Sequence, residues 1–363
     1  MCDFPGEDGA WVPSVSATPS GRPLAVPDTD NSAVVRCARY RVPRNNTSGM
    51  VVVEHSAPDT FLPMPISPER DDAIRLRLAE QFRSAGEVID PMSVEGIWPI
   101  GPGSAASNDR LLTTGLPNFL VAEVSAGGVH LPLTQARSLM EEAAMAFVSL
   151  GLQSLAGDPA LRAAAIPPIA RAAAEKAATA FWVLDDPDST MRLNRSLVVE
   201  IAGLDSLLRF YPQIATEDGP EQRLRAARDT LIHIAERDCG PVRYKRTRLS
   251  INDVALPSLT QRVKNASGQD NAYAEQSAST HPTGHATLVR STDSRGSGPV
   301  VTYRGSSTLH DEGRIVSPAA VSFARTATVV AQLISCRPIY DRAAAWLPGI
   351  ADSWSEWCSE NGC

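Results

Sequence analysis

The stretch from Ile166 to Tyr211 constrains the fold of this 363-residue chain more than any other part of it. Pro167 and Pro168 favour a helix start, because proline fits the first turn of a helix but not its interior. The residues that follow, up to Leu184, include no glycine or proline and are rich in alanine, the strongest helix former. Turn-forming residues interrupt the helix at Asp185–Ser189, and apolar residues spaced by three or four then predict a second helix. We therefore predict an antiparallel helical hairpin.

Charged residues on this hairpin are the first candidates for a site. Arg171 and Glu175 lie four apart on the first helix, and Arg192 and Arg195 lie three apart on the second. Two interpretations remain open. The residues form solvated helix faces, or they form a network of ion pairs between the helices that fixes the register of the hairpin.

Helical spacing recurs along most of the chain. Breaker residues bound the predicted helices Pro68–Ser84, Thr134–Leu155 and Glu221–Asp238, and a helical region Thr302–Trp357 that is interrupted at Pro338. The fold class we predict is mainly α, a helical bundle with a short N-terminal region that is partly β and partly disordered. The predicted organisation is an N-terminal region at 1–64, a helical body at 65–264, a flexible loop at 265–300, and C-terminal helices completing the bundle at 301–363.

Composition narrows the classes of function. The net charge of −7 argues against a broad basic surface for nucleic acid but leaves room for a local one, and Tyr244–Arg248 is a basic cluster. The six cysteines form no C-x-x-C pair, and Pro282 and Gly284 prevent His281 and His285 from sharing a helix, so we expect no metal and no cofactor. Neither a signal peptide nor a run of 18 apolar residues is visible, so we expect a cytoplasmic protein without membrane contact.

One spacing points to nucleic-acid chemistry. Arg228 and His233 match R-x4-H on a predicted helix, a pattern that resembles the signature of HEPN-type helical domains, some of which are ribonucleases. The resemblance implies a homodimer in which the histidine acts as general acid or base on RNA and the arginine stabilises phosphate charge. Arg304 and His310 match the looser R-x5-H form. Because arginine is abundant, the composition alone predicts about as many matches by chance.

A second, broader resemblance covers roughly residues 130–350. Arg171-x3-Glu175, Ala180–Asp185, Arg192 and Arg195, and the late Tyr303-Arg304-x-Ser306-Ser307-x-x-His310 resemble a group of uncharacterised all-helical proteins of actinobacterial type. The group usually has leucine at the position of Ser306 and glycine at that of Asp311. The resemblance implies an all-α body, and it does not indicate any particular activity.

These observations favour a structural or interaction role, with partners that the sequence does not identify, because no catalytic set rises above chance. The first alternative is a HEPN-like ribonuclease or toxin-type effector that uses Arg228 and His233, and RNA is a partner only in that case. The second is a small-molecule or nucleotide-binding helical module. If Tyr303 and His310 lie two turns apart on one helix, they could converge with Arg171 and Glu175 on a polar cleft. The alternative interpretation is that the same residues form a buried polar network. The candidate binding residues are Arg171, Glu175, Arg192, Arg195, Tyr303, Arg304 and His310.

Overall fold

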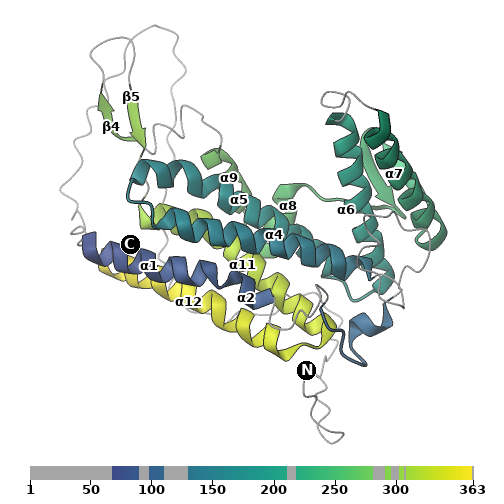
Figure 1. The fold of residues 1–363 in the computed structure, drawn as a ribbon, viewed down its shortest axis with the longest axis horizontal. Helices are drawn as coiled ribbons and strands as arrows, with labels where there is room; N and C mark the ends of the chain where they lie inside the picture. The colour runs from purple at the N-terminus through teal and green to yellow at the C-terminus, as the bar shows by residue number, and fades with distance from the viewer. Residues whose placement is uncertain are drawn as a thin grey trace, which may run out of the picture. The chain divides into compact units, whose positions relative to one another are not determined.

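The computed structural model describes residues 68–89, 98–109, 130–210, 218–280, 291–295, 302–305 and 308–361. Contacts divide the chain into the units Met1–Thr60 and Phe61–Cys363, and all described residues belong to the second. The predicted N-terminal region at 1–64 therefore lies outside the described residues. The described unit is mainly α, as predicted (Figure 1).

Five long helices form a closed ring of neighbours. α1 (Pro68–Arg83) contacts α4 (Leu131–Ser154), which contacts α5 (Pro159–Leu184), and α5 contacts α11 (Leu309–Ile334). α11 contacts α12 (Arg337–Asn361), which returns to α1 (Figure 1). The shorter α2 (Ala85–Ile89), η1 (Ala105–Asn108), α8 (Leu259–Ser267) and α9 (Ala272–Thr280) pack around this ring. Both ends of the described unit thus build one bundle.

Aromatic side chains fill the middle of the bundle. The ring centroid of Phe147 on α4 lies 5.3 Å from that of Phe323 on α11 and 5.1 Å from that of Trp346 on α12. Phe82 on α1 lies 5.8 Å from the same phenyl ring. Such tilted and edge-on pairs add to the burial of apolar area. The Nε1–H of Trp346 donates to the carbonyl of Gln81, so this tryptophan ties α12 to α1.

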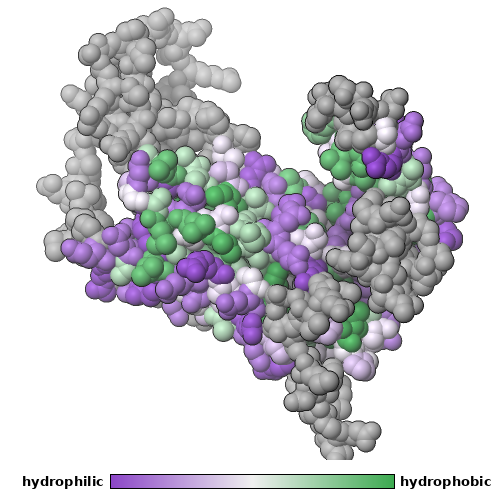
Figure 2. Space-filling model, in the orientation of Figure 1, coloured by the Kyte–Doolittle hydropathy of each residue, from purple (hydrophilic) through white to green (hydrophobic). Residues whose placement is uncertain are grey.

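Apolar residues also lie on the solvent side of α4 and α5. Met145, Leu152 and Leu161 are each more than half exposed, and Figure 2 shows apolar surface over these two helices. Because both faces carry apolar residues, the helical period is weak in these two helices.

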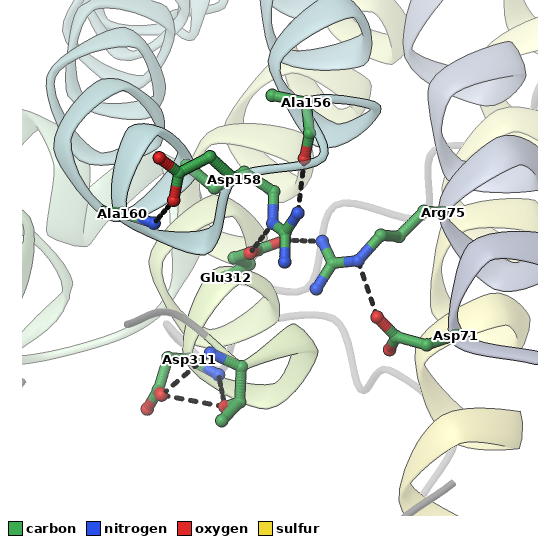
Figure 3. Close-up of polar contacts among 9 residues, drawn as sticks. Asp71, Arg75, Ala156, Asp158, Ala160, Asp311 and Glu312 are labelled. Carbon is green, nitrogen blue, oxygen red and sulfur yellow. Dashed lines mark hydrogen bonds and ion pairs between the residues drawn. The ribbon is translucent and has the colours of Figure 1, made fainter. Parts of the chain in front are cut away.

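α5 corrects one prediction. Pro167 and Pro168 lie inside the helix, which begins eight residues earlier, where the Asp158 side chain accepts a hydrogen bond from the amide of Ala160 (Figure 3). The apolar residues on both sides of the two prolines, among them Ile166 and Ala170, are buried in the same core. This packing outweighs the backbone hydrogen bonds that the prolines cannot donate.

A buried ion network joins α1, α5 and α11. Glu312 lies between two arginines: its Oε2 is 2.5 Å from Nη1 of Arg75, and its Oε1 is 3.2 Å from Nε of Arg162 (Figure 3). Arg75 also donates through Nε to Asp71, and Arg162 donates to the carbonyl of Ala156. Burial lowers the pKa of Arg75, but the charges and hydrogen bonds of Glu312 and Asp71 together outweigh burial, so that pKa is raised.

A second core lies around α6 (Ser189–Phe210) and α7 (Asp218–Asp238). The strands β1 (Val242–Lys245), β2 (Arg248–Ile251) and β3 (Val254–Ala255) form an antiparallel sheet in the order β1-β2-β3, within the segment where we predicted only helix. Apolar residues of α6, α7 and β2 make this core, including Leu197, Leu231 and Leu249. The predicted antiparallel hairpin is therefore wrong: both helices form, but α6 packs more extensively against α7 than against α5 (Figure 1).

Two predictions about the later chain also need correction. The predicted flexible loop at 265–300 holds the end of α8, all of α9, and the strand β4 (Ser291–Arg295). β4 pairs antiparallel with β5 (Thr302–Gly305), so Tyr303 and Arg304 belong to a strand rather than to a helix. Within the described residues, no helix has the length and apolar character that crossing a membrane requires.

Candidate functional site

Arg171 and Glu175 lie together, as their spacing predicts, and α9 completes their surroundings. The Nε of Arg171 donates to Oε1 of Glu175 at 2.8 Å, and its Nη2 donates to the phenol oxygen of Tyr273 at 2.6 Å. The Tyr273 hydroxyl donates to the same Oε1 at 3.1 Å. Burial and the charge of Glu175 raise the pKa of Tyr273, while Arg171 opposes the rise. These three side chains form a closed hydrogen-bonded ring at the edge of the bundle.

Arg262 on α8 lies beside this ring and differs from Arg171, the one arginine in it. Its residue is only 7% exposed, and its buried Nε has no hydrogen-bond partner. Burial lowers the pKa of Arg262, and the nearby Glu175 and Tyr273 counteract that only in part. The polar cluster therefore combines two guanidinium groups with one carboxylate.

Arg192 and Arg195 do not join the cluster. Arg192 is 2% exposed, so it is not on a solvated helix face. It pairs with Asp109, through Nε at 3.1 Å among other contacts, and the Nε2 of His130 lies 2.9 Å from the same carboxylate. Arg195 donates to the carbonyls of Trp182 and Asp185 at the end of α5. Both arginines fix the start of α6, and neither pairs with Glu175 in the way that an inter-helix network requires.

The late motif is divided between a strand and a helix. Tyr303 and Arg304 lie on β5, whose backbone contacts α5. His310 is exposed in the first turn of α11, and Thr308 and Asp311 form a capping box that begins this helix. Tyr303 and His310 consequently do not share a helix face, which corrects the geometry on which the predicted cleft depended.

Arg228 and His233 lie on α7, as predicted, but they point to different sides of it. Five residues correspond to a rotation of about 140° around a helix. Arg228 faces α6 and β1, where it donates to Asp205 through Nε at 2.6 Å and to the phenol oxygen of Tyr244 at 3.0 Å. His233 is exposed to solvent, rather than packed among apolar residues. Within one chain, the two side chains do not meet at a common site.

A groove lies between α6, α7 and the three-stranded sheet. One cavity of about 430 Å³ is lined by Asp205, Leu208, Arg209, Arg225, Arg228, Asp229, Tyr244 and Thr247. A second cavity of about 450 Å³ shares Asp205, Arg209 and Thr247 with it and is also lined by Arg248 and Leu249 of β2 and by Leu256. The two cavities therefore adjoin at these shared residues, and we refer to them together as the groove. Basic side chains outnumber acidic ones along it.

The β1–β2 hairpin adds positive charge at the rim of this groove. Residues 241–250 include four basic residues and no acidic residue. Lys245 and Arg248 are direct partners across the two strands, and Arg246 occupies the turn with a left-handed φ of 61°. All three are exposed, and none forms an ion pair with a carboxylate of the described residues. Like charges directly opposite each other destabilise a strand pair unless an anion lies between them.

The described residues hold no group of three or more His, Cys, Asp and Glu side chains that could bind a metal ion. Comparisons with known proteins found no matching family, no similar curated protein and no similar solved structure. The chemistry of the polar cluster and of the groove therefore follows from their own residues alone.

Sequence reasoning missed Arg262, Tyr273 and Arg209 as candidate site residues. Arg209 and Arg262 are single arginines on helices, a pattern that the chain repeats many times. Tyr273 lies in the segment predicted to be a flexible loop. The basic cluster Tyr244–Arg248 was recognised in the sequence. Placing its exposed cations on the two strands of a short hairpin would have identified it as a candidate site.

Proposed function

We propose that this protein binds the phosphate groups of nucleotides, in a single-stranded nucleic acid or in a free nucleotide, in the groove between α6, α7 and the β1–β2 hairpin. The observation that carries the proposal is the facing pair Lys245 and Arg248, with Arg246 between them in the turn, at the rim of a groove lined by further arginines. A phosphate bridging these side chains would remove their mutual repulsion. The proposed role is an interaction role, which the sequence favours because no catalytic set rises above chance.

Tyr244 adds a second element that suits a nucleotide. It is 42% exposed and lines the groove, where it faces Arg228 with its ring centroid 5.6 Å from the guanidinium carbon. Burial and the charge of Asp205 raise the pKa of Tyr244, so the phenol stays neutral at physiological pH. Basic grooves with an accessible aromatic ring are typical of proteins that bind single strands without sequence preference.

The groove geometry favours binding over cleavage. Arg228 is held by Asp205, Asp229 and Tyr244, which already use its Nε and both terminal nitrogens. A transition-state arginine needs donors that are directed at the reacting phosphate. His233 lies on another side of α7, so the ribonuclease alternative requires a second protomer to supply the missing group.

Fluorescence anisotropy with a labelled 20-nucleotide RNA tests the proposal. We expect Lys245→Gln with Arg248→Gln to weaken binding at least tenfold at low salt. The slope of log affinity against log salt should fall by about 1.4, since each phosphate contact on a single strand contributes about 0.7. The matched control is Arg70→Gln with Arg337→Gln, which removes equal charge from exposed positions of α1 and α12. Equal affinity of the two double variants would contradict the proposal.

Competition and product analysis separate the ligand sources. If a mononucleotide displaces the labelled RNA and its own binding depends on Lys245 and Arg248, the ligand is a free nucleotide. If only oligonucleotides compete, the ligand is a strand. Cleavage of the RNA that His233→Ala abolishes would favour the ribonuclease alternative over simple binding.

A further inference from the structure

The polar cluster of α5, α8 and α9 is a second candidate site, separate from the groove. The key residue is Arg262, which packs against α5 from α8 with 93% of its surface removed from solvent. A buried guanidinium group loses its hydration, and a protein ordinarily compensates that loss with hydrogen bonds or a paired carboxylate. Arg262 has neither among the described residues, and its Nε is wholly buried without an acceptor.

Glu175, the carboxylate whose charge acts on Arg262, cannot fill this role fully. The Oε1 of Glu175 already accepts hydrogen bonds from Arg171 at 2.8 Å and from Tyr273 at 3.1 Å. The cluster contains two guanidinium groups, one carboxylate and a phenol, so it carries a net positive charge. Arg75 and Arg162 show how the same chain compensates buried arginines elsewhere: they share the carboxylate of Glu312 (Figure 3).

We infer that Arg262 forms the floor of a binding site for a small oxyanion, a phosphate or carboxylate group, whose rim is made by Arg171 and Tyr273. Arg171, Glu175 and Tyr273 are half-buried, so the cluster reaches the surface at these residues, whereas Arg262 is buried. The planar guanidinium group presents paired donors that match two oxygens of either anion. The class of ligand is a small anionic metabolite rather than a polymer, because the unpartnered charge is buried.

Thermal unfolding of the full chain with added anions tests this inference. Inorganic phosphate and acetate are titrated separately against sodium chloride at equal ionic strength. We expect one of them to raise the Tm in a saturating manner, by about 2–4 °C at saturation. The anion that saturates at the lower concentration identifies the class. If neither anion gives a saturating rise, the site does not exist.

Three variants give the experiment its controls. Arg262→Met removes the unpaired charge while keeping a similar stem, so its Tm without added anion should equal or exceed that of the wild type, and it should show no anion-dependent rise. Arg262→Lys keeps the charge but loses the paired donors, so half-saturation should need at least five times more anion. The groove variant Lys245→Gln with Arg248→Gln should retain the full rise. This last variant keeps the two proposals separate, because failure of one site leaves the other measurable.

Two results would overturn the inference. A Tm of Arg262→Met several degrees below the wild type without anion, or failure of that variant to fold, would show that the protein itself compensates the charge of Arg262. An equal anion-dependent rise in Arg262→Met would show a general salt effect. Binding of phosphate to the wild type can also be measured directly, because binding broadens the phosphorus NMR signal of the phosphate. This broadening must be absent in Arg262→Met.

Discussion

Glu312→Gln should strongly destabilise the bundle, because it removes the single carboxylate shared by two buried arginines. The side chain of Glu312 is 6% exposed, and those of Arg75 and Arg162 are 4% and 9% exposed. Glutamine keeps the shape but leaves Arg162 without a carboxylate partner and Arg75 with Asp71 alone. Breaking a buried ion pair by removing one partner typically costs about 3–5 kcal/mol in the free energy of unfolding. Asp71 remains beside Arg75, so most of the cost should fall on Arg162.

Urea unfolding followed by tryptophan fluorescence measures this cost, since Trp346 lies in the same core. The matched control is Asp341→Asn, which breaks the exposed pair between Arg337 and Asp341 on α12 and should change stability by less than about 0.5 kcal/mol. The two variants should have equal m-values, so that a shift in midpoint reports stability alone.

A third variant tests the reasoning behind the prediction. Replacing all three buried charges by apolar residues of similar size, Arg75→Met, Arg162→Met and Glu312→Leu, should restore most of the stability lost in Glu312→Gln, because no buried charge is then left unpaired. A loss below about 1 kcal/mol in Glu312→Gln, or a triple variant no more stable than the single one, would refute the argument.

The helices of this chain are largely readable from local signals. The predicted helix Glu221–Asp238 is α7, Asp218–Asp238, and Pro68–Ser84 is α1, Pro68–Arg83. In both helices, breaker residues directly bound a stretch with a helical apolar period. Tertiary contacts are therefore not needed to recognise these helices. The capping box at Thr308 and Asp311 was equally readable and would have placed the start of α11 correctly.

Partner choice over long distances could not be read in this way. Arg192 pairs with Asp109, 83 residues earlier, although Asp185 and Asp188 are far closer in sequence. The second core depends on whether α6 turns toward α5 or toward α7, and the apolar stripe of α6 satisfies either arrangement. Local spacing gives the apolar face of a helix but does not identify the element that covers it.

The candidate site residues also divide into contacts that local spacing predicts and contacts that depend on long-range packing. Arg171 and Glu175 meet because they are one helical turn apart, which the sequence predicts directly. Tyr273 and Arg262 join them only because α8 and α9 pack against α5, and both come from segments without a recognisable motif. An unpaired buried arginine is defined by what surrounds it, so only a structure can reveal it.

Three further substitutions test individual contacts. Burial alone would raise the pKa of Asp109, but the adjacent His130 imidazole and the hydrogen-bonded Arg192 outweigh it and hold that pKa below its ordinary value. Asp109 therefore stabilises the fold above its ordinary pKa near 4, and this contribution is lost as the pH falls through the lowered pKa. Asp109→Asn should be less stable than the wild type at pH 7 in urea unfolding, and the difference should shrink toward pH 3; a constant difference would contradict this account. Burial raises the pKa of Glu200, and a hydrogen bond from Gln135 offsets this only in part. Glu200→Gln should hence be at least as stable as the wild type at pH 7, and any advantage should vanish as acid protonates the wild-type carboxyl group; a less stable variant at pH 7 would show that the charge is needed. Pro168 is exposed inside α5, where its ring removes a helical hydrogen bond. Pro168→Ala should restore that bond and raise the free energy of unfolding by about 1–3 kcal/mol, measured in urea, because no buried contact is lost. A destabilised variant would mean that the core depends on the backbone geometry that the proline imposes.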